Sequence, residues 1–159
     1  MPSKLQQDIK QSKPFANIES EVYLNIVLLA QELGSPVKSL LKTAGLSPAQ
    51  YNVLRILRGA GDEGLTCSEV GKRMVHRVPD VTRILDRLEC RGLIARRRRD
   101  DDRRVVCAQI LPAGQTLIDP LDGPIATVHA NTLGAMPPEQ LHALRDLLDA
   151  ARTAVGKAP

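Results

Sequence analysis

Aromatic residues are nearly absent from this sequence, which has two tyrosines, one phenylalanine and no tryptophan among 159 residues. Leucine, valine, isoleucine and alanine must therefore fill the interior, and little material is left for a large aromatic ligand cage. Glycine-rich phosphate loops, nucleophile elbows and paired catalytic motifs are also missing, so the sequence predicts neither an enzyme nor a bound cofactor. A chain of this length is expected to form one domain.

Cysteine is scarce as well. Cys67, Cys90 and Cys107 are widely spaced and odd in number, which fits neither a disulfide framework nor a zinc ribbon and favours a reducing compartment. The three histidines lack the spacing of metal ligands, so no metal site is expected. No signal peptide is recognisable, and no apolar run reaches the roughly 18 residues of a membrane span. We therefore expect a cytoplasmic protein with no membrane partner.

Positive charge is concentrated in one segment. The net charge is only +4, but arginine recurs at seven positions within a short stretch. These are Arg91, Arg96, Arg97, Arg98, Arg99, Arg103 and Arg104. Such clustering is the usual electrostatic footprint of a polyanionic partner, and a solvated surface face is the alternative.

Residues 46–74 predict two helices. Ser47 is a favourable N-cap and Pro48 a favourable first helical residue, so a helix is expected to begin there. Thr66, followed three residues later by Glu69, forms a capping box that predicts a second, shorter helix.

A third helix and a β-hairpin follow. Pro79 is expected in the first turn of that helix, which runs to a C-terminal cap at Gly92. Two short strands, at about 93–97 and 104–110, flank a charged loop and predict a hairpin with a protruding tip. Helix, turn, helix and hairpin are together the layout of a winged helix.

The flanking segments are expected to be largely helical. Residues 1–14 show no periodicity and predict a loose arm. From Ile18 onward, apolar residues surround a helix that Pro36 should kink or interrupt, and a helix apolar on most sides suggests contact with a second subunit. After the hairpin, a helical segment should break or kink near Pro120 and Pro124.

The last predicted helix starts near Pro138 and carries an apolar stripe with spacings of three and four. The stripe consists of Leu141, Leu144, Leu148, Ala151 and Val155. It is typical of a seam between helices of two chains, and packing against the chain's own core is the alternative. We expect one domain over residues 1–159 with a mainly α (α+β) fold, in which a winged helix-turn-helix lobe (46–111) joins a helical dimerisation region (15–45 and 112–156).

The third helix is the candidate recognition helix, because a helix fits the major groove and its first residues meet base edges. Arg83 can pair with guanine, Thr82 can touch a base or a thymine methyl group, and Asp80 can accept a hydrogen bond from cytosine or cap the helix. The helix N-terminus and the backbone amide of Thr66 or Ser68 can bind phosphate. The DNA-contacting residues predicted here are Ser68, His76, Arg77, Pro79, Asp80, Thr82 and Arg83.

The hairpin tip is the second candidate contact, because arginine fits a narrow, electronegative minor groove. Three aspartates, at 100–102, interrupt its positive charge. We interpret at least Asp102 as pairing with a nearby arginine and fixing its direction; mutual pairing of these charges in solvent is the alternative. The DNA-contacting residues predicted here are Arg97, Arg98, Arg99, Asp102 and Arg104.

Four stretches resemble the MarR family of bacterial transcriptional regulators: LSPAQYNVLRIL, GLTCSEVGKRM, PDVTRILDRLECRGLI and DDRRVVCAQILPAGQTLI. The resemblance covers residues 46–118. It implies a homodimeric repressor of a palindromic, inverted-repeat operator in double-stranded DNA, with a recognition helix over residues 79–91. It also implies that Asp102 orients basic side chains of the wing and that Arg104 enters the minor groove.

The sequence departs from the family's pattern at several positions. Asp80 stands where the family often has serine or threonine, and Arg99 where it usually has an acidic residue. Leu111 replaces a threonine that caps the next helix, a loss of about 1 kcal/mol. Pro120 and Pro124 are unusual for the long helix that follows.

The resemblance further implies release from DNA by a small aromatic or phenolic acid. Position alone suggests Tyr23, Tyr51, Arg55 and His129 as the effector-binding residues, and core packing of the two tyrosines is the alternative.

Two other functions remain open at this point. Cysteine-based redox sensing would use Cys67, expected in the first turn of a helix, a position typical of reactive thiols. Cys90 and Cys107 resemble packing residues, and oxidant sensors of the family usually carry a cysteine in their first helix, where this sequence has none. A non-specific architectural DNA-binding protein is the other possibility, which the polar residues of the recognition helix argue against.

Overall fold

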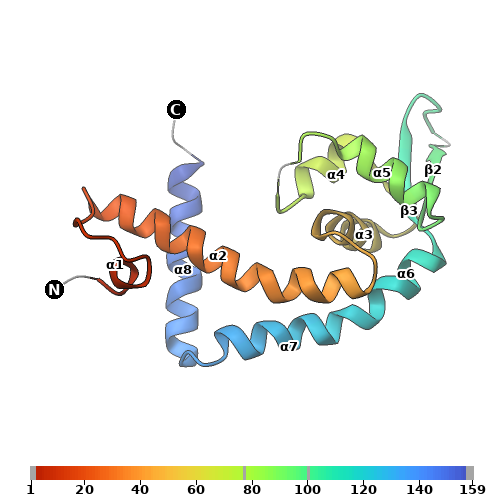
Figure 1. The fold of residues 1–159 in the computed structure, drawn as a ribbon. Helices are drawn as coiled ribbons and strands as arrows, with labels where there is room; N and C mark the ends of the chain where they lie inside the picture. Colours follow the sequence, from red (N-terminus) through yellow and green to blue (C-terminus); the bar gives the residue numbers. More distant parts are fainter. Residues whose placement is uncertain (1–2, 77, 100, 157–159) are drawn as a thin grey trace. The chain divides into compact units, whose positions relative to one another are not determined.

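The computed structural model describes residues 3–76, 78–99 and 101–156. The chain divides into two compact units, Met1–Pro48 and Ala49–Pro159, and each is described by itself (Figure 1). None of the helices within the described ranges combines the length and the apolar character required to cross a membrane.

Among its described residues, the first unit contains the whole of the helices α1 (Lys4–Asp8) and α2 (Ile18–Thr43). The short helix α1 replaces the expected loose arm. It forms because the Ser3 side chain accepts a hydrogen bond from the Gln6 amide and because Leu5 is buried. A cap and one buried leucine give no periodic pattern, so the prediction for this segment was wrong.

The long helix α2 (Ile18–Thr43) supplies most of the first unit. Its N-cap, Asn17, accepts a hydrogen bond from the Ser20 amide at 2.8 Å. Pro36 lies inside α2 and does not interrupt it, contrary to one of the two expectations. Proline removes one helical hydrogen bond, and in a helix of 26 residues the remaining bonds suffice to continue it.

The second unit opens with the winged lobe. Its helical elements are α3 (Pro48–Ala60), the 3-10 turn η1 (Gly61–Glu63), α4 (Cys67–Arg73) and α5 (Val81–Cys90). The helix α3 begins at the proline that the sequence favours, and α4 begins with the predicted capping box. The helix α5 ends just before Gly92, whose φ of 68° is the left-handed conformation of a helix C-terminus.

A three-stranded antiparallel sheet completes the lobe, in the order β1–β3–β2. Its strands are β1 (Leu65–Thr66), β2 (Ile94–Arg98) and β3 (Val106–Ile110). The last two form the predicted hairpin. The first was not predicted, because two residues carry no alternation; it exists through pairing of Leu65 with Ala108 and of Thr66 with Cys107. The mainly α fold with a small β-hairpin wing is therefore confirmed, with one additional strand.

Aliphatic side chains make up the core of the lobe, as the shortage of aromatic residues requires. The helix α3 contributes a fully buried face. The other side chains with almost no exposure in this unit come from α4, α5, β2 and α6, namely Val70, Leu85, Leu88, Ile94 and Ile118. This packing fixes α5 and the hairpin on the same small scaffold.

The elements after the sheet are α6 (Pro112–Ile118), the 3-10 turn η2 (Asp119–Leu121), α7 (Asp122–Leu133) and α8 (Pro138–Val155). Leu111 provides no side-chain cap for α6, as expected. The predicted break occurs at Pro120, within η2. Pro124 causes no break, because it lies in the first turn of α7, where an N–H would have no helical acceptor.

Candidate nucleic-acid interface

The recognition helix α5 begins two residues later than predicted. Its N-cap is Asp80, whose carboxylate accepts a hydrogen bond from the Arg83 amide at 2.8 Å. Pro79 therefore precedes the helix instead of opening it. Of the two roles considered for Asp80, helix capping is the one present in the structure.

The side chains at the start of α5 are exposed. Thr82 and Arg83 lie in its first turn, and His76 and Pro79 are exposed in the turn before it. Arg77, also predicted to contact DNA, lies outside the residues that the structure describes. The turn is held by Asn52 of α3, whose side-chain oxygen accepts a hydrogen bond from the Val75 amide at 3.0 Å. Sequence reasoning missed this contact, because its partners are separated by 23 residues and belong to no local motif.

The start of α4 lies beside the start of α5. Ser68 is exposed in the first turn of α4. In the same turn, the Glu69 carboxylate accepts a hydrogen bond from the Thr66 amide at 2.8 Å. This hydrogen bond, with that from the Thr66 hydroxyl, lowers the pKa of Glu69. Cys67 Sγ lies 3.4 Å from Thr82 Oγ1, so the Thr82 hydroxyl has a partner within the protein.

The wing tip presents one arginine in a fixed direction. Arg104 donates from Nε and Nη2 to the two carboxylate oxygens of Asp102, at 3.1 and 3.2 Å, and its amide donates to the same carboxylate at 3.0 Å. The Arg104 hydrogen bonds lower the pKa of Asp102. The Arg104 side chain is nevertheless 91% exposed. The pairing expected for Asp102 is therefore present, and it leaves the guanidinium facing solvent.

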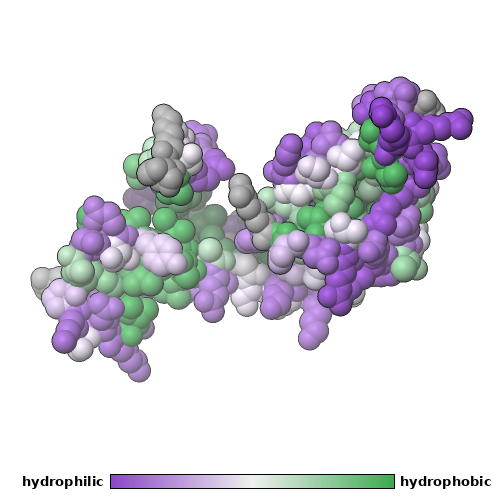
Figure 2. All heavy atoms as spheres, turned by 90° about the horizontal axis from the view of Figure 1, so that it is seen from above, coloured by the Kyte–Doolittle hydropathy of each residue, from purple (hydrophilic) through white to green (hydrophobic). Residues whose placement is uncertain are grey.

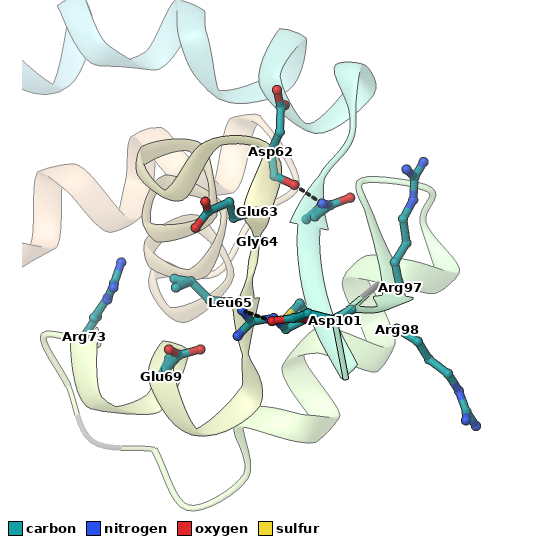
Figure 3. Close-up of a pocket in the computed structure, with 12 residues that line it drawn as sticks. Asp62, Glu63, Gly64, Leu65, Glu69, Arg73, Arg97, Arg98 and Asp101 are labelled. Carbon is teal, nitrogen blue, oxygen red and sulfur yellow. Dashed lines mark hydrogen bonds and ion pairs between the residues drawn. The ribbon is translucent and has the colours of Figure 1, made fainter. Parts of the chain in front are cut away.

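The other wing arginines differ in their surroundings (Figure 3). Arg97 and Arg98 are exposed and extend away from the lobe in different directions. Arg99 is held by Asp101, with Nη2–Oδ2 and Nε–Oδ1 distances of 2.9 and 3.0 Å. It lines a groove of about 630 Å³ whose other charged residues include Glu69, Arg73 and Glu63. The charge of Arg99 is thus partly compensated inside the protein.

Hydrophilic residues dominate the surface around the wing in the space-filling view (Figure 2). Long charged side chains on a hairpin and an exposed helix start are two surfaces that a DNA duplex can accept in its minor and major grooves.

The residues considered for an effector lie on three different helices, α2, α3 and α7. Tyr23 belongs to α2 in the first unit and is 65% exposed. Arg55 and His129 are exposed on α3 and α7. Tyr51 is half-buried and hydrogen-bonded to Asp122, and burial followed by the Asp122 charge raises the pKa of its hydroxyl.

The three cysteines differ in exposure, and Cys67 is half-buried at the start of α4. Cys107 is buried in the sheet, as expected of a packing residue. Cys90 is exposed at the end of α5, so its assignment as a packing residue was wrong; the helix turns this position away from the core. Within the described residues, no group of three or more histidine, cysteine or acidic side chains is arranged to bind a metal.

Comparisons with known proteins converge on one family. A family model described as "MarR family" matches residues 46–106. The HTH-type transcriptional repressor MdtR of Bacillus subtilis is 29% identical over 84% of this chain and 88% of its own length. A crystal structure of a MarR transcription factor from Planctomyces limnophilus is 32% identical, covers 86% of this chain and 99% of that one, and has a TM-score of 0.64. The MepR–DNA complex of S. aureus shares the fold, with a TM-score of 0.74 at 19% identity over 84% of this chain and 96% of that one.

Proposed function

Since the chain belongs to the MarR family of DNA-binding transcriptional regulators, which are not enzymes, we propose that it represses transcription as a homodimer bound to an inverted-repeat operator. The observation that carries this proposal is the wing, in which Asp102 holds an exposed Arg104. An arginine fixed in this way loses less conformational freedom when it enters a minor groove. Arg83, at the capped start of α5, is the corresponding candidate for reading base edges.

The remaining contacts are assigned by their exposure. Thr82 belongs to the first turn of the recognition helix, Ser68 to the start of α4 and His76 to the turn before α5. Arg97 and Arg98 extend the wing. Arg99 is assigned a weaker role than Arg104, because its side chain is 52% exposed, against 91% for Arg104. Asp80 acts by capping α5 and not by contacting a base.

A homodimer is proposed because two helices carry apolar side chains that the single chain leaves exposed. Those of α2 are Ile18, Val22, Tyr23, Ile26, Val27 and Leu29. In α8, Leu147, Leu148 and Val155 are exposed, and no residue of the helix is buried. Apolar (green) atoms are visible at the surface in Figure 2. Contiguous exposed apolar residues mark interaction sites, and an inverted repeat requires a protein with two-fold symmetry.

Release from the operator is proposed to follow binding of a small aromatic or phenolic acid. Arg55, one helical turn after Tyr51 on α3, offers a cation to the carboxylate, and Tyr51 offers an aromatic edge. Tyr23 and His129 are weaker candidates, because each is exposed on another helix.

Selection of bound sequences from a random duplex pool, with the protein's mass in solution measured in parallel, tests the proposed function. We expect an inverted repeat whose half-sites lie about one helical turn apart, bound by a protein of twice the chain mass. Recovery of no motif would indicate non-specific architectural binding, and a monomeric mass would contradict the proposed symmetry.

Replacing Asp80 separates its capping role from its charge. Asp80→Ser keeps a side-chain acceptor for the Arg83 amide and removes a carboxylate that repels phosphate. We therefore expect unchanged thermal stability and a roughly two- to tenfold gain in operator affinity at low salt. Asp80→Ala removes the acceptor as well and should cost about 1 kcal/mol of folding free energy. Thermal melts and binding isotherms measure both effects; equal stability of the two variants would contradict the capping role.

A further inference from the structure

Arg96 differs from the arginines that follow it in the wing. It lies in the middle of β2, and its side chain is only 26% exposed. Its guanidinium does not extend into solvent but contacts the recognition helix. Nη1 lies 2.6 Å from Asp86 Oδ1 and 3.4 Å from Glu89 Oε2. Nη2 donates to the Thr82 carbonyl oxygen at 3.3 Å.

The Arg96 backbone takes part in the same connection. Because β2 is an edge strand of the sheet, one side of its backbone is not used by β3. The Arg96 amide donates from that side to Glu89 Oε1 at 3.1 Å. Backbone and side chain of one strand residue therefore both bind α5.

The partners on α5 lie along one face of the helix. Thr82, Asp86 and Glu89 are spaced by four and three residues, so they occupy successive turns. Arg96 thus contacts α5 from its first turn to its last. Two carboxylates on a helix that approaches phosphates are electrostatically unfavourable for binding DNA. Their pairing with Arg96 explains their presence, because it connects α5 to β2.

We propose that Arg96 is a positioning residue: it fixes the wing relative to α5, so that Arg104 and Arg83 reach the two grooves together. This inference rests on the proposed operator binding. Ion pairs with this much exposure add little to folding stability. Recognition groups, however, must be held within a fraction of an ångström of their productive positions. Loss of Arg96 therefore affects selectivity more than stability.

If only net charge mattered, removing the positive partner of the ion pair and removing a negative partner would change DNA affinity in opposite directions. Arg96→Gln removes a positive charge, whereas Asp86→Asn removes a negative charge from a DNA-binding helix. If only net charge mattered, Asp86→Asn would strengthen binding to every duplex. If Arg96 acts by positioning, both variants reduce the preference for the operator.

The experiment compares the inverted repeat recovered by selection with a scrambled duplex of the same length and composition. For Arg96→Gln and for Asp86→Asn, we expect the ratio of the two affinities to fall about tenfold. The controls Arg73→Gln and Asp62→Asn make the same charge changes elsewhere in the lobe. They should shift the affinities for both duplexes alike and leave the ratio unchanged.

A double-mutant cycle with Arg104→Ala measures how strongly Arg96 and Arg104 depend on each other in operator binding, and a general loss of stability does not produce such coupling. In the parent protein, Arg104→Ala should weaken operator binding. In the Arg96→Gln background its effect should shrink, because a displaced wing no longer delivers Arg104 to the groove.

An unchanged affinity ratio in Arg96→Gln and Asp86→Asn, or strictly additive effects in the cycle, would overturn the inference. If the thermal melt showed that Arg96→Gln does not fold, Asp86→Asn alone would decide. A lower ratio of operator to scrambled-duplex affinity in that variant would support the inference, and stronger binding to both duplexes would contradict it. A parent protein that bound repeat and scrambled duplex equally would instead refute the proposed function.

Discussion

Gly114→Ala is expected to lower the free energy of unfolding by about 3 kcal/mol, the upper end of the usual range for overpacking. Gly114 lies in the first turn of α6 and is buried. A Cβ atom at this position would lie 2.3 Å from the Leu93 carbonyl oxygen and 2.9 Å from Cγ1 of Ile110. The first of these is a backbone atom and already accepts the Leu111 amide at 3.0 Å. The start of α6 would have to move away from the sheet, and urea or thermal unfolding followed by circular dichroism measures the cost.

Gly123→Ala is the matched control for this prediction. Gly123 lies in the first turn of α7, and apart from its chain neighbours and the backbone of its own helix no atom lies within 4 Å of a Cβ built there. Alanine is intrinsically more favourable than glycine within a helix, by at most about 1 kcal/mol, so this variant should be as stable as the parent or more stable. Both variants must be compared at one protein concentration, because dimerisation couples stability to concentration. Equal stability of Gly114→Ala and Gly123→Ala would show that α6 does not pack as closely on the sheet as described.

The sequence predicts the elements whose signals are local. A cap requires only residues three positions apart, so Thr66 with Glu69 predicts the start of α4 correctly. Where two local signals compete, the sequence predicts that a helix is present but not the residue at which it begins. Pro79 and Asp80 both mark a helix start, and Asp80 prevails because its carboxylate reaches the Arg83 amide.

Elements and contacts that depend on distant residues were not predictable. β1 has two residues and exists only through its pairing with β3. The run of arginines likewise gives no indication that Arg96 contacts α5 while Arg104 faces solvent. One signal was present, however: Asp86 and Glu89 are acidic residues on a helix expected to approach DNA, and such residues require a cationic partner.

The proposed dimer leads to the largest expected effect on function. Leu148 lies in α8 and is 39% exposed in the single chain, and the heptad-like stripe of this helix runs through it. Leu148→Glu would place a carboxylate in an apolar interface, where an unpaired charge is costly. We expect monomers at micromolar concentration and a loss of operator affinity of about a hundredfold or more, because two linked half-site contacts become separate binding events. Analytical ultracentrifugation and binding isotherms measure these two quantities.

His142→Glu is the control, because it adds a carboxylate to an exposed position of α8 that lies about 120° or more around the helix from both Leu147 and Leu148. It should remain dimeric and bind the operator like the parent protein. A Leu148→Glu dimer with parental affinity would place the subunit contact elsewhere. The affinity for a single half-site separates the remaining explanations: a dissociated but folded Leu148→Glu chain should keep its half-site affinity, since α5 and the wing belong to a lobe whose buried core residues do not include Leu148. Loss of half-site binding as well would mean that α8 supports the lobe itself and not only the dimer.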